Sequence, residues 1–434
     1  MMQLVKSSSN IAVALVVILC ASIGLASDQI PGAKQTRSIV IMGATVHTVS
    51  GDAIENGSVV FSAGKITAVG RSVAFPADAE RLEAKGAHVY PGLIDAISPI
   101  GLVEIESVRA TIDHRETGEN NANVRAVAAF NPDSELIPVA RANGLLVALS
   151  APTGGLISGQ SSLMMLDGWN AQDMALQADC AMHINWPRMT APNTGSGRSN
   201  DDLETLNQLF SQAQRYAAAR ASDATQAVDL RLEALAKTLD GKMPIIVGAT
   251  SVAQIQSAVA FAKQRKLRLI IFGGYEAPEC AELLRRENVP VIVSGVYRLP
   301  TYRHSAYDSA YTLPQRLHAA GVQFCISATE RFGASNLRNL PYHAATATAY
   351  GLSEQVALRA ITLSPAEILG VADRIGAIKV GNDATLFIAD GNILETPTQV
   401  THAFVQGRKV DLDNRHKQLY RKYTEKYDRQ KSAP

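Results

Sequence analysis

Short apolar runs separated by turn residues follow residue 38. The runs at 39–42 and 58–61 are rich in β-branched residues, and glycines separate them from their neighbours. This pattern is typical of a small antiparallel β-domain. A similar pattern returns at 385–389 and 402–406. Because the ends of a domain often meet in space, we expect both regions to form one composite β-sandwich domain.

The middle of the chain alternates between apolar strands and amphipathic helices. Strand-like runs occur at 245–247, 289–294 and 322–327, and a helix-like segment at 313–320 precedes the last of them. Such repeats, with nearly continuous apolar strands, are typical of a parallel sheet covered by helices. The length of the region, 91–370, favours a (β/α)8 TIM-like barrel, so the expected fold class is α/β. In such a barrel, the chemistry takes place at the C-terminal ends of the strands.

The N-terminal residues have the pattern of a secretory signal peptide. Lys6 supplies the positive charge, residues 11–20 are almost entirely apolar, and Gly24 and Ala26 are small residues suited to a signal peptidase. We expect cleavage after about Ala26 and a secreted or periplasmic mature protein. The alternative is a membrane anchor, for which the apolar run is short.

The C-terminal residues read as a basic helix. Leu412, Leu419, Tyr423 and Tyr427 recur near helical spacing, which predicts an exposed amphipathic helix packed on the body. The whole chain is thus expected to comprise a signal peptide at 1–26, the β-sandwich in two parts at 38–90 and 371–411, the barrel at 91–370, and a basic helical tail at 412–434.

Charge and cysteine content narrow the classes of partner. The 434 residues hold 41 Lys and Arg against 40 Asp and Glu, so the chain has no net charge that would attract nucleic acid or an anionic membrane. We therefore expect no nucleic-acid partner, and no membrane contact other than through the signal peptide. The hydrophobic share of 47% can fill a sizeable core, which excludes wholesale disorder. Cys180, Cys280 and Cys325 are scattered, so we expect buried free thiols rather than a disulfide framework or a zinc knuckle.

Three motifs resemble one known family. Residues 90–96 read Tyr-Pro-Gly-Leu-Ile-Asp-Ala, residues 361–370 read Ile-Thr-Leu-Ser-Pro-Ala-Glu-Ile-Leu-Gly, and residues 374–384 lead back into the β-rich region. Together and in this order they resemble the amidohydrolase superfamily, particularly its imidazolonepropionase-like and adenine-deaminase-like members. In that family, the first motif leads from a composite β-sandwich into the first strand of a barrel.

The resemblance implies a hydrolase of non-peptide C–N bonds of the amide, amidine or cyclic ureide type. Family members hold zinc or a similar divalent metal with His and Asp side chains at strand ends. The metal acidifies a water, and the resulting hydroxide attacks the carbon of the C–N bond. This chemistry needs three or four protein ligands around an open coordination position.

The positions that match the family's ligands carry no such donors here. The His-x-His pair that follows the first motif corresponds to Ile97 and Pro99. The histidines of the fifth and sixth strands correspond to Gly248 and Gly273, and the aspartate of the last strand corresponds to Thr329. We therefore expect these five positions to line the pocket without binding a metal, and we expect no cofactor.

Two hypotheses for the function follow. Glu330, next to the position of the lost aspartate, is a weak candidate for a catalytic carboxylate in a hydrolase with altered chemistry. The alternative is a catalytically inactive protein that binds a small molecule, or that pairs as a structural subunit with a related amidohydrolase in a homo- or hetero-oligomer. A further segment, 151–160, is rich in glycine and is expected to form a tight loop after a barrel strand.

Overall fold

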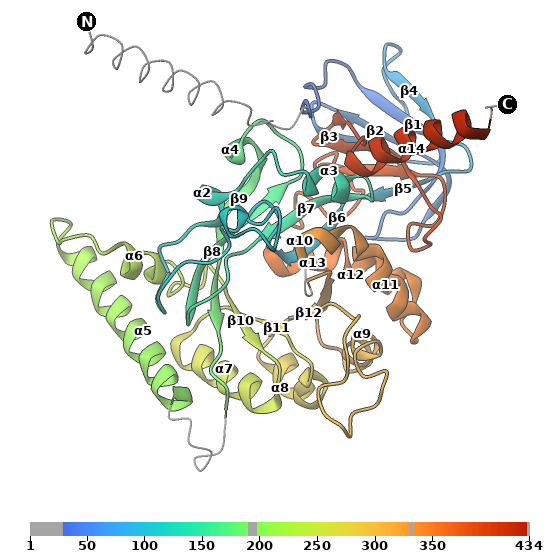
Figure 1. Cartoon of the computed structure of the whole chain (residues 1–434). Helices are drawn as coiled ribbons and strands as arrows, with labels where there is room; N and C mark the ends of the chain where they lie inside the picture. The colour runs from blue at the N-terminus through green and yellow to red at the C-terminus, as the bar shows by residue number, and fades with distance from the viewer. Residues whose placement is uncertain (1–28, 190–197, 330–332, 432–434) are drawn as a thin grey trace, which may run out of the picture. The chain divides into compact units, whose positions relative to one another are not determined.

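The computed structural model describes residues 29–189, 198–329 and 333–431, and these form two eight-stranded sheets with helices around the second (Figure 1). In the first sheet the strand order is β16-β15-β14-β5-β1-β2-β3, with β4 paired to β1. The strands are β1 (Ile39–Val46), β2 (Ile54–Ser62), β3 (Lys65–Gly70), β4 (Glu80–Glu83), β5 (His88–Pro91), β14 (Leu386–Ala389), β15 (Val400–Val405) and β16 (Arg408–Val410).

This first sheet joins the two ends of the chain. Strand β5 pairs antiparallel with β14, so that Val89 lies opposite Ile388. The apolar residues that alternate along these strands pack on one side, where Phe61 and Phe404 meet edge to face with ring centroids 5.0 Å apart. The prediction of a separate β-domain composed of both chain ends is therefore confirmed.

The second sheet is a nearly closed barrel of order β13-β12-β11-β10-β9-β8-β7-β6. Its apolar strands form the core that was predicted for 91–370. This confirms the TIM-like barrel. The strands are β6 (Leu93–Ser98), β7 (Leu145–Ser150), β8 (Ile157–Met165), β9 (Ala175–Asn185), β10 (Ile245–Ala249), β11 (Leu269–Gly273), β12 (Val291–Ser294) and β13 (Phe324–Ser327).

One barrel strand departs from the parallel pattern. Strand β8 runs antiparallel to both β7 and β9, and it includes the second half of the segment 151–160 that was expected to be a loop. Gly154 and Gly155 have φ angles of +86° and +65°. These left-handed conformations, which glycine adopts readily, reverse the chain directly after β7. A connection this short joins antiparallel strands, because a parallel pair needs a longer crossover.

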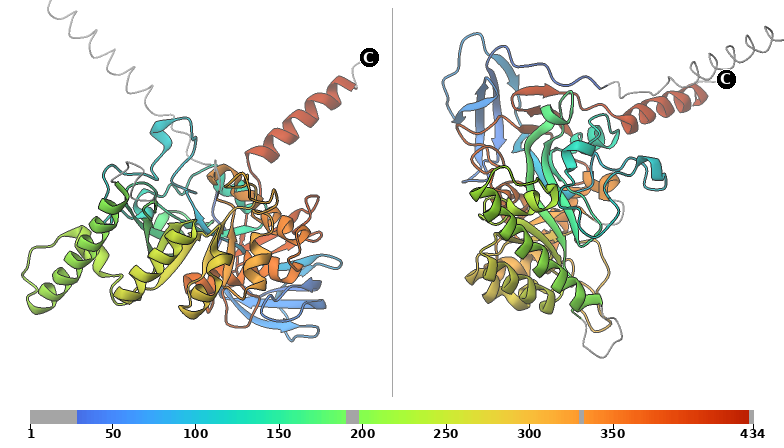
Figure 2. Two further views of the ribbon diagram at one scale, coloured as in Figure 1. Left: turned by 90° about the horizontal axis from the view of Figure 1, so that it is seen from below. Right: turned by 90° about the vertical axis from the view of Figure 1, so that its left-hand side faces the viewer.

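Helices lie outside the barrel sheet (Figures 1 and 2). Helix α7 starts with a capping box between Ser251 and Gln254, and its Phe261 packs edge to face on Phe210 of α5. None of the described helices is long and apolar enough to cross a membrane. The helices are α2 (Ala126–Ala129), α3 (Leu136–Arg141), α4 (Ala171–Met174), α5 (Arg198–Ser222), α6 (Leu230–Ala236), α7 (Val252–Arg265), α8 (Ala281–Arg286), α9 (Leu313–Ala319), α10 (Gly333–Asn336), α11 (Leu340–Ala349), α12 (Glu354–Ala360), α13 (Leu363–Leu369) and α14 (Arg415–Lys431), with short 3-10 turns at Arg109–Thr111, Ala277–Cys280 and Leu337–Asn339.

Helix α14 forms where the basic tail was predicted to be helical, but none of its residues is buried. Of the predicted apolar face, Leu412 packs against the barrel core just before the helix, whereas Tyr423 and Tyr427 are 47% and 55% exposed. The expected packing on the body is therefore found at the start of this segment and not along the helix. The helix is instead rich in charge, and Arg421 pairs with Asp413 just before its first turn.

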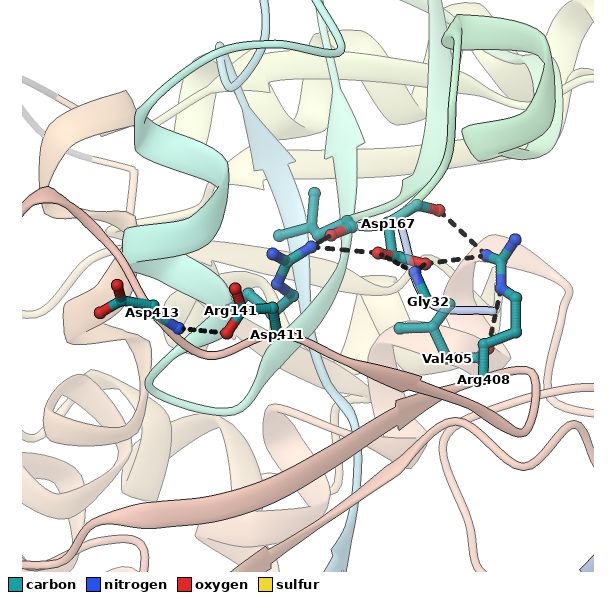
Figure 3. A network of polar contacts seen from close by, with 8 residues as sticks. Gly32, Arg141, Asp167, Val405, Arg408, Asp411 and Asp413 are labelled. Carbon is teal, nitrogen blue, oxygen red and sulfur yellow. Dashed lines mark hydrogen bonds and ion pairs between the residues drawn. The ribbon is translucent and has the colours of Figure 1, made fainter. Parts of the chain in front are cut away.

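A buried ion pair connects the sheet domain to the barrel (Figure 3). The carboxylate of Asp167, which follows β8, accepts a hydrogen bond from Arg141 Nη1 at 3.2 Å and forms an ion pair with Arg408 of β16 at 3.4 Å. The backbone N–H of Gly32 donates to the same carboxylate at 3.3 Å. Because Arg141 and Asp167 are both buried, each charge depends on the other for compensation.

A second buried carboxylate closes the barrel. Asp95 on β6 accepts hydrogen bonds from Ser327 Oγ of β13 at 2.8 Å and from the N–H of Ala328 at 2.7 Å. The N–H of Ile97 donates to it at 3.0 Å. Burial raises the pKa of Asp95 to about 6, although all three donors act in the opposite direction. Asp95 therefore links the first strand of the barrel, β6, to the last strand, β13.

We predict that the Asp95 carboxyl titrates with a midpoint near pH 6 in an NMR titration of its side-chain carbon. The folded pKa lies above the ordinary value of 3.8. The contribution of the protonated Asp95 carboxyl to the free energy of unfolding is therefore complete below about pH 4, and it is lost as the pH rises through about 6.

The control is Asp413, whose pairing with Arg421 lowers its pKa. Its contribution to stability is present at neutral pH and is lost on acidification. We compare the free energies of unfolding of Asp95→Asn and Asp413→Asn with that of the unmodified protein from pH 4 to 7. The difference in free energy of unfolding between Asp95→Asn and the unmodified protein should change as the pH passes about 6. The difference for Asp413→Asn should stay constant over this range, because its pKa lies below the ordinary value of 3.8. An Asp95 midpoint at its ordinary value contradicts the assignment.

Candidate functional site

The strand register shows which side chains share the inner face of the barrel. Val291 lies against the turn at Gly274 that precedes α8, which places Val291 on the outer, helix-covered face. Side chains alternate along a strand, so the next position, Ile292, faces inward. Ile292 pairs with Phe272, and Phe272 pairs with Gly248. The inner face at the C-terminal strand ends therefore includes Phe272 and Gly248, and the next pair along the sheet adds Asn185 of β9.

Three of the five predicted pocket positions lie together at this end of the barrel. The carbonyl of Ile97 accepts hydrogen bonds from the side chains of Ser327, at 2.9 Å, and of Thr329. Gly333, at the start of α10, lies beside both Pro99 and Thr329. Ile97 is only 8% exposed, so its side chain belongs to the wall of the barrel rather than to solvent.

Of the other two predicted positions, Gly248 lies on the inner face of the barrel and Gly273 does not. A Cβ atom at Gly248 would meet nothing closer than Asn185 Oδ1, at 3.7 Å, so the inner face is open there. Gly273 pairs with Ala249, one residue beyond the inner-facing pair, and Phe272 takes the inward position on this strand instead. Glu330, the candidate carboxylate, lies outside the described residues.

One buried histidine was not identified from the sequence. His183 on β9 pairs with Ile246, two residues before Gly248 on the same face, and is 6% exposed. Its Nε2 atom is buried and has no hydrogen-bond partner among the described residues. Burial lowers the pKa of the imidazole to about 3, so the ring is neutral at neutral pH. The only signal in the sequence is a single polar residue within the apolar run Ala181–Ile184.

A cationic side chain lies in the segment after β12. The guanidinium carbon of Arg298 is 2.9 Å from the ring centroid of Tyr275, which follows β11. Burial lowers the pKa of Arg298, and its Nε atom has no partner among the described residues. A partly desolvated guanidinium with a free N–H group is suited to binding an anionic group.

The described residues do not offer a metal centre. They contain no group of three or more His, Cys, Asp or Glu side chains that could hold a metal ion. Of the described barrel strands, only β9 carries a histidine, and Asp95 is engaged in closing the barrel. Cys180, Cys280 and Cys325 are buried free thiols, as expected. The donor set that the described residues place at the strand ends therefore does not fit the zinc chemistry implied by the resemblance.

Comparison with known sequences identifies relatives of the chain. Residues 249–410 match the model of the amidohydrolase family. The amidohydrolase tasK of Hapsidospora irregularis is 22% identical over 393 residues, which cover 81% of this chain. The match spans only 39% of the length of that relative.

Solved structures agree with this relationship. An amidohydrolase from Thermotoga maritima MSB8 superposes with a TM-score of 0.77 at 25% identity, and the match covers 86% of this chain and 99% of that one. An adenosine deaminase from Xanthomonas campestris with bound Zn has a TM-score of 0.50 at 18% identity, covers 91% and 99% of the two chains, and shares the fold. The sequence matches and the Thermotoga maritima structure together show that this chain belongs to the amidohydrolase superfamily.

Proposed function

We propose that this chain is an exported amidohydrolase-fold protein that binds a small molecule at the barrel mouth and does not hydrolyse it through a metal-bound hydroxide. One observation carries the proposal. The strand-end positions at which the family resemblance implies metal ligands hold Ile97, Pro99 and Gly248, and these side chains have no donor atom for a metal.

The chemistry of C–N hydrolysis supports this proposal. A divalent metal lowers the pKa of its bound water enough to supply hydroxide at neutral pH. Without that metal, the reaction requires a general base, and Asp95 is unsuited because its carboxylate is buried and hydrogen-bonded to Ser327 and Ala328. The competing proposal is a hydrolase of altered chemistry in which Glu330 carries the proton.

The inner face of the barrel supports the binding of a polar ligand. Gly248 leaves space beside Asn185, and the neutral His183, two residues deeper on the same face, has a ring nitrogen without a hydrogen-bond partner among the described residues. Arg298 adds a positive charge in the segment after β12. A small amide or ureide, with or without a negative charge, matches these groups.

We further propose that the chain is exported and that it forms an oligomer. Residues 1–26 have the pattern of a signal peptide, so the mature chain would begin at Ser27 outside the cytoplasm. A barrel that keeps its scaffold while lacking the family's ligands also suits a homo- or hetero-oligomer with a related amidohydrolase. Co-purification of such a subunit from the source organism would support that part of the proposal.

The first test measures metal and turnover on the purified mature protein. We expect substoichiometric zinc, manganese, iron and cobalt by elemental analysis, and no hydrolysis of hydantoin, dihydrouracil or N-acetylglycine above the background rate. A stoichiometric metal that supports turnover would contradict the proposal. Metal-free turnover that is lost in Glu330→Gln would favour the competing hydrolase.

The same three compounds test binding through the shift of the thermal unfolding midpoint. We expect at least one to stabilise the protein, because a ligand that binds only the folded state raises its stability. Gly248→Leu should abolish this shift by filling the open space. Gly248→Ala is the matched control, since a Cβ atom fits there at ordinary contact distance.

His183→Leu should separate stability from binding. It removes a buried ring nitrogen that has no partner among the described residues, so we expect the free energy of unfolding to rise by about 1 kcal/mol in urea denaturation. The ligand-induced shift should fall at the same time. His318→Leu, at an exposed position of α9, is the control and should change stability by less than about 0.5 kcal/mol. Strong destabilisation of His183→Leu would show that the imidazole has a structural role.

A further inference from the structure

A cavity of about 450 Å³ lies away from the barrel mouth. It is lined by the sheet domain on one side and by helix α12 on the other. The volume is within the range of small-molecule sites. The lining residues share none of the positions of the candidate site; they are His47, Thr48, Val49, Gly51, Asp52, Ala53, His88, Tyr90, Glu354, Gln355, Leu358, Asn392 and Leu394.

Three nearly parallel rings lie at one side of this cavity: the half-buried imidazoles of His47 and His88, and the ring of Tyr90, which is only 1% exposed and supports them. The ring of His47 stacks on Tyr90 with centroids 4.3 Å apart and an interplanar angle of 8°. His88 stacks beside His47 at 5.2 Å, and His47 Nε2 is hydrogen-bonded to His88 Nδ1 at 2.9 Å. Tyr90 is held in place from behind, because its hydroxyl accepts a hydrogen bond from the N–H of Ile393 at 3.3 Å. The wall is therefore a preformed aromatic surface.

The lining of the cavity also carries acidic side chains. Glu354, the first residue of α12, accepts a hydrogen bond from Asn392 at 3.4 Å, and Asp52 is a second carboxylate residue in the lining. Among the described residues that line the cavity there is no Lys or Arg. Burial, with a smaller contribution from His88, lowers the pKa of His47 to about 4, so this imidazole does not offset the carboxylates at neutral pH.

We propose that this cavity is a second ligand site and that it takes a planar aromatic cation, such as an aromatic amidine or an amine-bearing heterocycle. The ring of the ligand would stack on the imidazoles of His47 and His88, which the buried ring of Tyr90 supports, and a cation there gains from the aromatic faces. Its N–H groups would donate charge-assisted hydrogen bonds to Glu354. The proposal does not depend on the proposed function of the barrel.

Isothermal titration calorimetry of the full chain with benzamidine at pH 7.5 and low salt tests this site. We expect saturable binding, and we expect the uncharged isostere benzamide to bind roughly tenfold more weakly or not at all. Glu354→Gln should weaken benzamidine binding by roughly tenfold, because it removes the charge of an exposed helix residue without removing its shape.

Two control variants keep the result specific. Asp373→Asn changes an exposed carboxylate outside the cavity and should leave the affinity unchanged. Gly248→Leu blocks the barrel mouth and should also leave it unchanged, which separates this site from the function proposed above. The proposal is overturned by absence of saturable benzamidine binding up to about 10 mM, by equal binding of benzamide, by unchanged affinity in Glu354→Gln, or by loss of binding in Gly248→Leu.

Discussion

The barrel depends on the buried carboxylate of Asp95, which links its first and last strands. Strands β6 and β13 are the two ends of the barrel sheet, and the side chain of Ser327 and the backbone of Ala328 both donate to Asp95 across that seam. These contacts satisfy a carboxylate that would otherwise be costly to bury. The Thr329 hydroxyl adds a bond to the Ile97 carbonyl at the same seam. Closure is thus achieved by the chain's own hydrogen bonds.

This arrangement explains how the fold would persist at the barrel mouth proposed above, where the described strand ends hold no cluster of metal-binding side chains. In the family that the chain resembles, a metal would tie several strand ends together. Here, direct hydrogen bonds between Thr329, Ser327 and Ile97 link the ends of β6 and β13. The ion pairs of Asp167 provide a second, independent link, between the barrel and the sheet domain. The scaffold can therefore be retained while the interior of the mouth changes its chemistry.

Periodicity and motifs predicted the architecture better than the site. The β-branched runs at 39–42 and 385–389 identified the composite sheet, because their apolar alternation reflects burial on one face. The direction of β8 was not predicted, since it depends on the φ angles of Gly154 and Gly155 rather than on hydrophobicity. At the site, the motif at 90–96 directly precedes Ile97 and Pro99, so their alignment with the family's His-x-His pair is unambiguous. No adjacent motif aligned Gly273, and the strand register shows that its neighbour Phe272 faces inward. His183 was not identified because it lies in an apolar run that matches no motif.

The most direct test of the central claim is a crystal structure of the protein grown in zinc chloride, with anomalous scattering recorded at the zinc edge. Our account predicts no anomalous peak at the strand ends around Ile97, Gly248 and Thr329, whatever zinc binds elsewhere on the surface. A peak there with ordinary zinc–ligand distances would contradict the account, because it would show that the barrel mouth retains a metal centre.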